Sequence, residues 1–383
     1  PTTNPTSTTI YKMLLALKTR NAIILSPHPH AVNCSIAAAK IIRDAAIEAG
    51  LPEHVISWVS VPSLEISDYL MKNVDLIMAT GGSGMVKAAY SSGTPAIGVG
   101  PGNCNVVIDE SADLRMAVES IIHSKTFDNG MICASEQHIT VLASVYDEVK
   151  RLLKEARCYF LKDDEAAKVA EVFFNSKTHG VKPGAVGQTA NRLAEMAGID
   201  VPYDTKVLIY ETDDTSHDCA WANEKLTTLL GMYKAETLDE AYDICYKLVL
   251  EGGAGHSAAL YIDPAEEEKI TKFGLRMKAG RVIINQPTSF AGIGDLYNFD
   301  IAPSLTLGPG AVGHSAYMGN TNYEQLLDIK VLTMRKENML WLQLPKKVYF
   351  KTGCTPVALR EMKEVYDFKR AFIITCLLYT SPS

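Results

Sequence analysis

The chain has 383 residues, 47% of them hydrophobic and 21% charged, which is ordinary for a folded protein. Its net charge of −7 argues against a nucleic-acid partner, because phosphate binding requires a basic surface. No apolar stretch approaches the ~18 residues that a membrane helix needs, and the first residues do not resemble a signal peptide. These features favour a cytoplasmic protein with reduced thiols. Since the chain starts at Pro1, we expect the natural N-terminus to lie further upstream.

The first hundred residues alternate short aliphatic strands with helical patterns. Strands are expected at 21–25, 55–59, 75–79 and 96–99, and helices at 31–49, 63–71 and 84–90. The strands are almost continuously apolar, which is typical of parallel strands covered on both faces. Repeated β–α units of this kind predict an α/β fold with doubly wound open sheets.

A second α/β segment follows the first. Helices are expected from 111 to the Asp-Asn-Gly turn at 128–130 and at 144–156, 164–175, 237–251 and 264–278, with strands at 137–142, 206–210, 258–262 and 281–284. Residues 286–320 are rich in Gly, Pro, Ser and Asn and show little periodicity. We expect a long loop there, of the kind that is usually functional or interfacial.

Two glycine clusters follow the third and fourth expected strands. Thr80, Gly81 and Gly82 precede a helix, whose first N–H groups and dipole can bind a phosphate. Gly98 opens the second cluster, Gly-Val-Gly-Pro-Gly-Asn over 98–103, at the C-terminal end of a strand, where open sheets bind ligands. Either cluster alone is equally consistent with a tight turn, because neither has the Gly-x-Gly-x-x-Gly pattern. Together they favour a nucleotide site.

Cys133 stands out among the eight cysteines, which show no metal-ligand or disulfide spacing. A cysteine is more often a small buried hydrophobe than a nucleophile. Here, however, a polar Asp-Asn-Gly turn precedes it and Ser-Glu-Gln follows at 135–137, and both are poor neighbours in an apolar core. We therefore interpret Cys133 as a reactive thiol, with Cys104 as the reserve candidate.

Seven segments taken in order carry a resemblance to a known family. They are PTTNPTST (1–8), ATGGSGMVKAAYSSG (79–93), VGPGN (99–103), FDNGMICASEQ (127–137), NEKL (223–226), GGAGHS (252–257) and GIGDLYNF (292–299). Together they resemble the aldehyde dehydrogenase superfamily, in particular the CoA-acylating half of bifunctional aldehyde–alcohol dehydrogenases. The similarity extends to about residue 375.

The resemblance also implies a domain plan. Residues 1–103 would form a cofactor-binding domain whose N-terminal part is missing, 104–300 a catalytic domain with the nucleophilic cysteine, and 301–329 a loop and oligomerisation segment. Residues 330–347 would be a linker and 348–375 the start of an iron-dependent alcohol dehydrogenase domain. Residues 376–383 do not fit the family, and we expect them to be a non-native tail.

The resemblance assigns roles to individual residues. Cys133 matches the nucleophile that attacks an aldehyde carbonyl, and the Asn4 amide matches an oxyanion-hole donor. Glu224 matches the residue that binds the nicotinamide ribose. Ser26, Pro27 and His28 match the segment beside the adenosine. Without the resemblance, Asn4 and His28 would be interpreted as loop residues and Glu224 as a surface charge.

Gly98 decides the subclass. In hydrolytic aldehyde dehydrogenases this position is a glutamate that activates water. Without it the acyl-thioester would wait for the thiolate of coenzyme A. His256 resembles a residue of the acylating subclass, either near the thiol acceptor site or merely packed in the core.

The resemblance thus implies NAD as cofactor, CoA as co-substrate, acetaldehyde and acetyl-CoA as the substrate pair, and a homo-oligomer or filament in the full-length protein. The alternatives are a hydrolytic aldehyde dehydrogenase and an inactive dinucleotide-binding or assembly module.

Overall fold

The computed structural model describes residues 4–177, 180–294, 301–334 and 347–370. The chain divides into two compact units, Pro1–Leu327 and Asp328–Ser383. All of the candidate site residues lie in the first unit. In the second unit, the helix α12 (Thr355–Tyr366) lies within the range that the sequence suggests to be the start of another domain.

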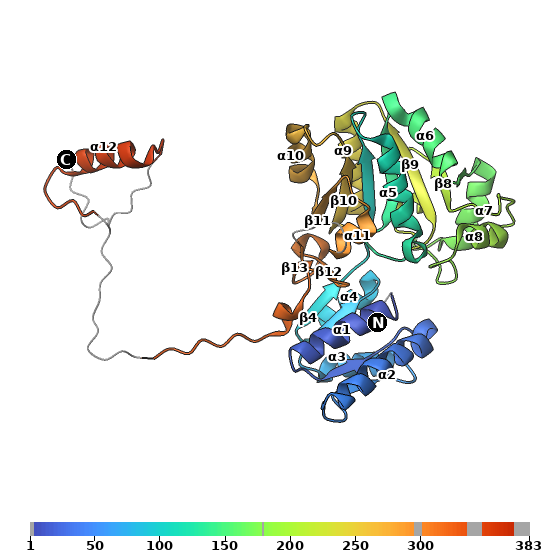
Figure 1. Ribbon diagram of the computed structural model, residues 1–383, viewed down its shortest axis with the longest axis horizontal. Helices are drawn as coiled ribbons and strands as arrows, with labels where there is room; N and C mark the ends of the chain where they lie inside the picture. Colours follow the sequence, from blue (N-terminus) through green and yellow to red (C-terminus); the bar gives the residue numbers. More distant parts are fainter. Residues whose placement is uncertain (1–3, 178–179, 295–300, 335–346, 371–383) are drawn as a thin grey trace. The chain divides into compact units, whose positions relative to one another are not determined.

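A seven-stranded sheet in which every neighbouring pair is parallel dominates the first unit (Figure 1). Its strand order is β11-β10-β5-β6-β9-β8-β7. The strands are β5 (Cys104–Ile108), β6 (Glu136–Leu142), β7 (Cys158–Phe160), β8 (Val207–Glu211), β9 (Leu229–Ala235), β10 (Gly255–Tyr261) and β11 (Ala279–Ile284). The predicted α/β class is confirmed by this sheet.

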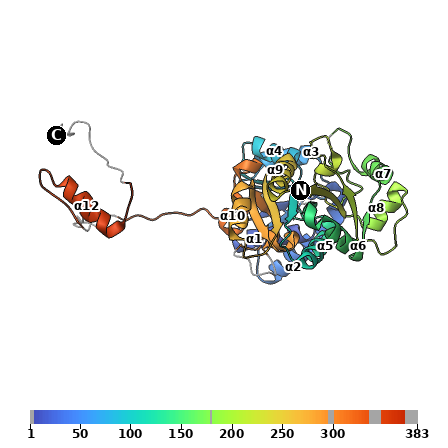
Figure 2. The same ribbon diagram turned by 90° about the horizontal axis from the view of Figure 1, so that it is seen from above.

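Helices cover both faces of this sheet, and alternate side chains of a strand pack on opposite faces. Val106 and Ile108 of β5 pack with helices α5 (Leu114–Thr126) and α6 (Tyr146–Glu155), while Val107 between them packs with α9 (Leu238–Gly252). Figure 2 shows α9 on the opposite side of the sheet from α5 and α6. Covering on both faces explains why these strands are apolar throughout.

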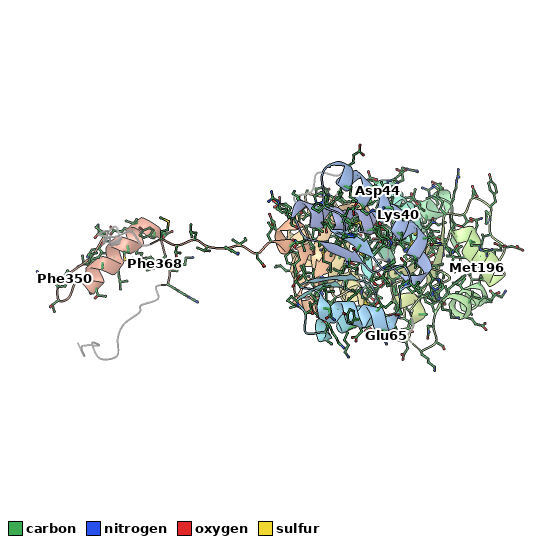
Figure 3. The ribbon with its side chains drawn as sticks, turned by 90° about the horizontal axis from the view of Figure 1, so that it is seen from below. Lys40, Asp44, Glu65, Met196, Phe350 and Phe368 are labelled. Atoms are coloured by element: carbon green, nitrogen blue, oxygen red, sulfur yellow. The ribbon has the colours of Figure 1, made fainter. Side chains whose placement is uncertain are left out.

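The N-terminal part of the first unit, residues 4–99, is built around two separate parallel strand pairs. The pairs are β1 (Ile23–Leu25) with β2 (Ile56–Trp58), and β3 (Ile77–Thr80) with β4 (Ala96–Val99). The helices are α1 (Ser7–Lys18), α2 (Val32–Glu48), α3 (Leu64–Asn73) and α4 (Ser83–Ser91). Lys40 and Asp44 of α2 and Glu65 of α3 are exposed on its surface (Figure 3).

The remaining helices of the first unit flank the seven-stranded sheet. Phe173 of α7 (Asp163–Phe173) and Leu193 of α8 (Ala190–Ala197) pack into a common apolar cluster near β8. On the α9 side, α10 (Glu267–Arg276) contributes the buried Phe273. Within the described residues, none of the helices combines the length and apolar character needed to cross a bilayer.

The expectation of one long loop over 286–320 is wrong for its described part. The helix α11 (Thr288–Ile293) and an antiparallel pair, β12 (Leu307–Pro309) with β13 (Met318–Asn320), lie within it. Elements of three to six residues are too short to show a period, and glycine-rich strands resemble turns in the sequence. Residues 295–300 lie outside the described part of the chain.

Candidate active site

The segment that leads to Cys133 has an unusual backbone. Asp128, Asn129 and Gly130 all have positive φ, at 50°, 49° and 74°, a conformation that Asn, Asp and Gly tolerate best. A side chain on Gly130 would also crowd the carbonyl oxygen of Thr227, at 2.6 Å. The Asn129 side chain donates a hydrogen bond to the Gly187 carbonyl at 3.0 Å. These contacts fix the turn from which Cys133 projects before β6 begins.

Cys133 and His256 are in direct contact. The Cys133 Sγ lies 3.1 Å from His256 Nε2, and His256 Nδ1 lies 3.0 Å from the Ser257 hydroxyl. Burial lowers the pKa of His256 to about 3, with a further lowering by the charge of Arg281. Burial, followed by the charge of Glu224, raises the pKa of Cys133 to about 12, while Arg281 and nearby backbone N–H groups oppose this. The resting pair is therefore a neutral thiol beside a neutral imidazole.

Glu224 reaches the same place from another segment. Its Oε1 accepts a hydrogen bond from the Gly102 backbone N–H at 2.8 Å, and burial raises the pKa of Glu224 to about 8. A Cβ on Gly102 would overlap the carbonyl oxygen of Cys133 and crowd His256. At Gly102 the connection between β4 and β5 therefore packs against the backbone of Cys133. A larger residue would push this connection and Cys133 apart.

The expectation that Ser135, Glu136 and Gln137 make poor core neighbours is wrong, because all three are fully buried. Glu136 Oε1 accepts from the Thr288 N–H at 3.0 Å, and Gln137 Oε1 accepts from the Lys225 N–H at 2.9 Å. Partners from distant segments satisfy these two oxygens, which a local sequence pattern cannot show, whereas Ser135 Oγ and Glu136 Oε2 are buried without a hydrogen-bond partner among the described residues. The polar surroundings that singled out Cys133 are thus part of a hydrogen-bonded interior.

Asn4 lies against the turn before the nucleophile. Its side chain is buried, and its Nδ2 donates to Asp128 Oδ2 at 2.8 Å. Asp128 is five residues before Cys133 in the left-handed turn. The structure thus brings Asn4 to the nucleophile's segment from a position 129 residues away in the sequence.

Six of the residues expected at the cofactor lie at or after the carboxyl ends of β1 and β3, while Gly98 lies in β4 and Glu224 in the segment before β9. Thr80 ends β3 and accepts a 2.8 Å hydrogen bond from the buried Lys12, whose pKa burial lowers to about 7. Gly81 and Gly82 follow, and no side chain caps the first turn of α4. A Cβ on Gly82 would meet nothing within 4 Å, so this helix start is open. It suits an anionic ligand such as a pyrophosphate.

The segment after β1 is more exposed. Pro27 is buried, Ser26 is half-buried and His28 is exposed. The His28 Nδ1 accepts from the His30 N–H at 3.2 Å, a local turn contact. The described contacts of His28 thus match those of an ordinary loop histidine, with one face left open to solvent.

Gly98 is buried in β4 and faces α4. Its N–H donates to the Tyr90 hydroxyl at 2.8 Å. A Cβ at this position would lie 2.7 Å from the Tyr90 ring and 2.8 Å from a Val86 methyl. Packing therefore requires glycine at position 98, and the position consequently carries no carboxylate.

Several residues of the site were missed by sequence reasoning. They are Gly102, Asp128, Lys12 and Arg281. Gly102 and Asp128 stood in motifs that were recognised, but only distances show their roles. Lys12 and Arg281 were missed because a lone cation in a helix or strand is ordinarily a surface charge. No group of three His, Cys, Asp or Glu side chains that could hold a metal occurs among the described residues.

Comparison with known proteins identifies the family. Residues 3–169 match the model of the aldehyde dehydrogenase family. A succinate-semialdehyde dehydrogenase (acetylating) of Clostridium kluyveri is 35% identical over 86% of this chain and 72% of its own length. The chain belongs to the aldehyde dehydrogenase family.

Two further proteins have a higher sequence identity to this chain than the Clostridium kluyveri enzyme has. An aldehyde-alcohol dehydrogenase of Clostridium acetobutylicum is 50% identical over 98% of this chain, which spans 43% of that protein. The crystal structure of an acetylating aldehyde dehydrogenase from Geobacillus thermoglucosidasius superposes with a TM-score of 0.81 at 42% identity, covering 88% of this chain and 74% of that one. The chain thus spans less than half the length of the aldehyde-alcohol dehydrogenase that it matches.

Proposed function

We propose that this chain carries the CoA-acylating aldehyde dehydrogenase activity, in which an aldehyde, CoA and NAD are interconverted with an acyl-CoA and NADH. The observation that carries the proposal is the 3.1 Å contact between Cys133 Sγ and His256 Nε2. A neutral imidazole at this distance can accept the thiol proton as the sulfur attacks a carbonyl carbon.

The first half of the reaction uses Cys133, His256 and Asn4. The Cys133 Sγ gives its proton to His256 Nε2 and forms a bond to the aldehyde carbon, so that the carbonyl oxygen becomes an oxyanion. The backbone N–H of Cys133 and the Asn4 amide are the donors proposed for that oxyanion. To reach it, the Asn4 amide turns away from Asp128, to which it donates in the resting structure. NAD, when bound, accepts the hydride that converts the tetrahedral carbon to an acyl-thioester.

The residues near the nucleophile fit a dinucleotide. The open start of α4 at Gly82 suits a pyrophosphate, and the Glu224 carboxyl beside Gly102 is placed to accept hydrogen bonds from ribose hydroxyls. The Ser26–His28 segment would line the adenosine. These residues hold and orient the cofactor, and the proposal assigns no proton transfer to them.

The second half transfers the acyl group to the thiol of CoA. His256 first releases the proton of the first half to solvent. The CoA sulfur then attacks the thioester carbon and loses its own proton to His256, and Cys133 departs as a thiolate that takes this proton back from His256. Water would need a carboxylate base, and Gly98 offers none. Glu224, whose charge acts on Cys133, has one oxygen committed to the Gly102 N–H. Both features favour the acylating over the hydrolytic reaction.

Substrate and setting are part of the same proposal. By resemblance to the aldehyde-alcohol dehydrogenases, we infer acetaldehyde and acetyl-CoA as the pair, a cytoplasmic location and a homo-oligomeric full-length protein. Two of the relatives compared carry the word acetylating in their names, which supports the acceptor assignment.

The test compares NADH release from acetaldehyde and NAD with and without CoA. The proposal expects steady turnover with CoA and at most a single-turnover burst without it, because Cys133 then stays acylated. Steady CoA-independent turnover with formation of free acid would instead identify a hydrolytic enzyme. NADH binding without any turnover would point to a dinucleotide-binding module.

A further inference from the structure

Arg281 is a buried cation that the proposed reaction does not yet use. It lies on β11, and only 5% of its surface is exposed. Its guanidinium donates three hydrogen bonds, from Nε to Asn320 Oδ1 at 2.7 Å, from Nη1 to the His256 carbonyl at 3.1 Å and from Nη2 to the Gly308 carbonyl at 3.3 Å. All three acceptors are neutral oxygens, and Arg281 makes no ion pair with a described carboxylate.

The hydrogen bonds around Arg281 hold it in place without neutralising it. The Asn320 amide is itself fixed, because its Nδ2 donates to the carbonyls of Gly292 and Ala302 at 3.0 and 2.9 Å. Its oxygen is thereby turned toward the guanidinium. A buried guanidinium is ordinarily paired with a carboxylate, because taking a charge out of water is costly. An unneutralised charge at this position therefore acts on whatever ionisable group is near.

The charge of Arg281 acts on the Cys133 thiol, which contacts His256 at 3.1 Å, and the His256 carbonyl in turn accepts from Arg281. Helix α5 ends before the segment that contains Cys133, and α9 ends before β10, which carries His256, so their negative dipole ends lie at this end of the sheet. The Glu224 carboxyl adds to the same sign when it is ionised, which its pKa of about 8 allows only above neutral pH. Arg281 is the buried cation whose charge lowers the pKa of the Cys133 thiol, against burial and Glu224, which raise it.

We propose that Arg281 is an electrostatic positioning residue for the Cys133–His256 pair, whose unpaired charge stabilises the Cys133 thiolate while its hydrogen bond fixes the His256 backbone. The inference rests on the proposed function for its purpose, but it concerns the ionisation of Cys133 and can be tested without turnover. It predicts that charge at position 281, more than hydrogen bonding, sets the reactivity of the thiol.

The experiment compares Arg281→Lys with Arg281→Gln in the whole chain. Both variants lose the forked hydrogen bonds, but only lysine keeps the charge. Alkylation of Cys133 is followed by mass spectrometry with neutral iodoacetamide and anionic iodoacetate over a range of pH. Exposed Arg276 on α10, which pairs with Asp243, gives the matched control Arg276→Gln. Thermal melting establishes that each variant is folded.

We expect Arg281→Gln to shift the alkylation profile to higher pH, with about tenfold slower reaction at neutral pH, as a change of one pKa unit requires. The ratio of iodoacetate to iodoacetamide rates should fall in Arg281→Gln and be retained in Arg281→Lys. Equal profiles in the lysine and glutamine variants, or a wild-type profile in Arg281→Gln, would overturn the inference.

The failure of the proposed function is recognised separately. Turnover that survives Cys133→Ser would remove the proposed nucleophile, whatever the alkylation profile of position 281 variants. Conversely, an enzyme that depends on Cys133 but shows no effect of charge at position 281 would retain the proposed function and lose only the inference.

Discussion

Two sets of parallel strands contribute to the candidate site, one through its carboxyl ends and the other through its amino ends. The strands β1 and β3 of the N-terminal part end at Leu25 and Thr80, so their carboxyl ends lead into the expected cofactor segments. The seven-stranded sheet instead presents amino ends, because Cys133 and His256 stand before or at the start of β6 and β10. Figure 1 shows β12 and β13 between the two regions, where β12 contacts both β4 and β10.

The two ends differ in what the backbone offers. After a strand's carboxyl end comes a helix start, which supplies N–H groups and a positive dipole to an anion. Before a strand's amino end comes a helix finish, which supplies carbonyls and a negative dipole. Hence the cofactor region can bind phosphate largely with its backbone, whereas the catalytic region has to build its chemistry from buried side chains. The catalytic region should therefore be far more sensitive to side-chain substitution.

The largest expected effect is that of Cys133→Ser. A hydroxyl is a much weaker acid than a thiol, and burial lowers the pKa of the neighbouring His256 to about 3, so this imidazole is too weak a base to activate serine. NADH formation and labelling by an aldehyde-derived acyl group should both be abolished. The matched control is Cys104→Ala, at a buried cysteine of β5, for which a modest change is expected. More than about a tenth of the activity surviving in Cys133→Ser, a barrier change under ~1.4 kcal/mol, would rule out this nucleophile.

Asn4→Ala should come next. The oxyanion exists only in the tetrahedral states, so losing one donor should lower kcat by about 10²–10³ with little change in KM. Exposed Asn73 at the end of α3 gives the control Asn73→Ala, which should leave both constants unchanged. A rise in KM alone would mean that Asn4 binds substrate. The Asn4 amide would then contribute less to stabilising the oxyanion than we infer.

Gly98→Ala tests packing at the border between the regions. The added Cβ would press on Tyr90 and Val86, and overpacking of this kind costs about 1–3 kcal/mol of unfolding free energy. At Gly84 in α4 the same change meets nothing within 4 Å, so it should be neutral or stabilising by up to about 1 kcal/mol. Urea denaturation measures both. Equal unfolding free energies of Gly98→Ala and the unmutated protein would show that the Tyr90 ring moves aside at no cost.

The packing at Gly98 also changes the expectation for Gly98→Glu. The family comparison alone suggests that this glutamate would open a hydrolytic route. The structure indicates that its side chain would start toward α4 and displace Tyr90, so we expect no steady CoA-independent NADH release. Appearance of such turnover, with free acid, would show that the carboxylate finds its way to the acyl-enzyme.

The smallest effect is expected from His28→Ala in the cofactor region. His28 is exposed and its ring contacts its own turn, so KM for NAD should rise by less than about fivefold, under ~1 kcal/mol, at constant kcat. Lys40→Ala on the exposed face of α2 is the control. A loss in kcat comparable to that of Asn4→Ala would contradict the distinction between backbone-built and side-chain-built regions.

The sequence predicts this molecule well wherever information is local. A helix is expected over 63–71, and Ser63 at its start does accept from the Ile66 N–H at 3.1 Å; Cys133 lies between a helix and a strand. The strands β5, β7 and β9 and the helices α1 and α8 are among the elements that were missed. Asn105 in β5 and Thr8 and Thr9 in α1 interrupt the expected apolar patterns, yet all three are buried. Tertiary hydrogen bonds, such as Asn105 to Thr140 at 3.0 Å, replace the missing apolar signal.

The candidate site divides in the same way. Cys133 and the glycine clusters can be recognised from residue types and their neighbours. The contacts of Arg281 with His256, of Asn4 with Asp128 and of Gly102 with Glu224 join segments 25 to 124 residues apart. No pattern within one strand or helix encodes them, so their roles depend on the fold.

The buried Lys225 connects the strand that follows Cys133 with the segment that carries Glu224, and this connection should make the two segments open together. Its Nζ donates to the carbonyls of Gln137 and Asn223 at 3.1 and 2.9 Å and lies 3.0 Å from His138 Nε2. One side chain thus ties the strand after Cys133 to the segment that carries Glu224. Neither segment can open without breaking the same contacts, so their amide protons should exchange with solvent together and only in the slowest, largest opening of the sheet.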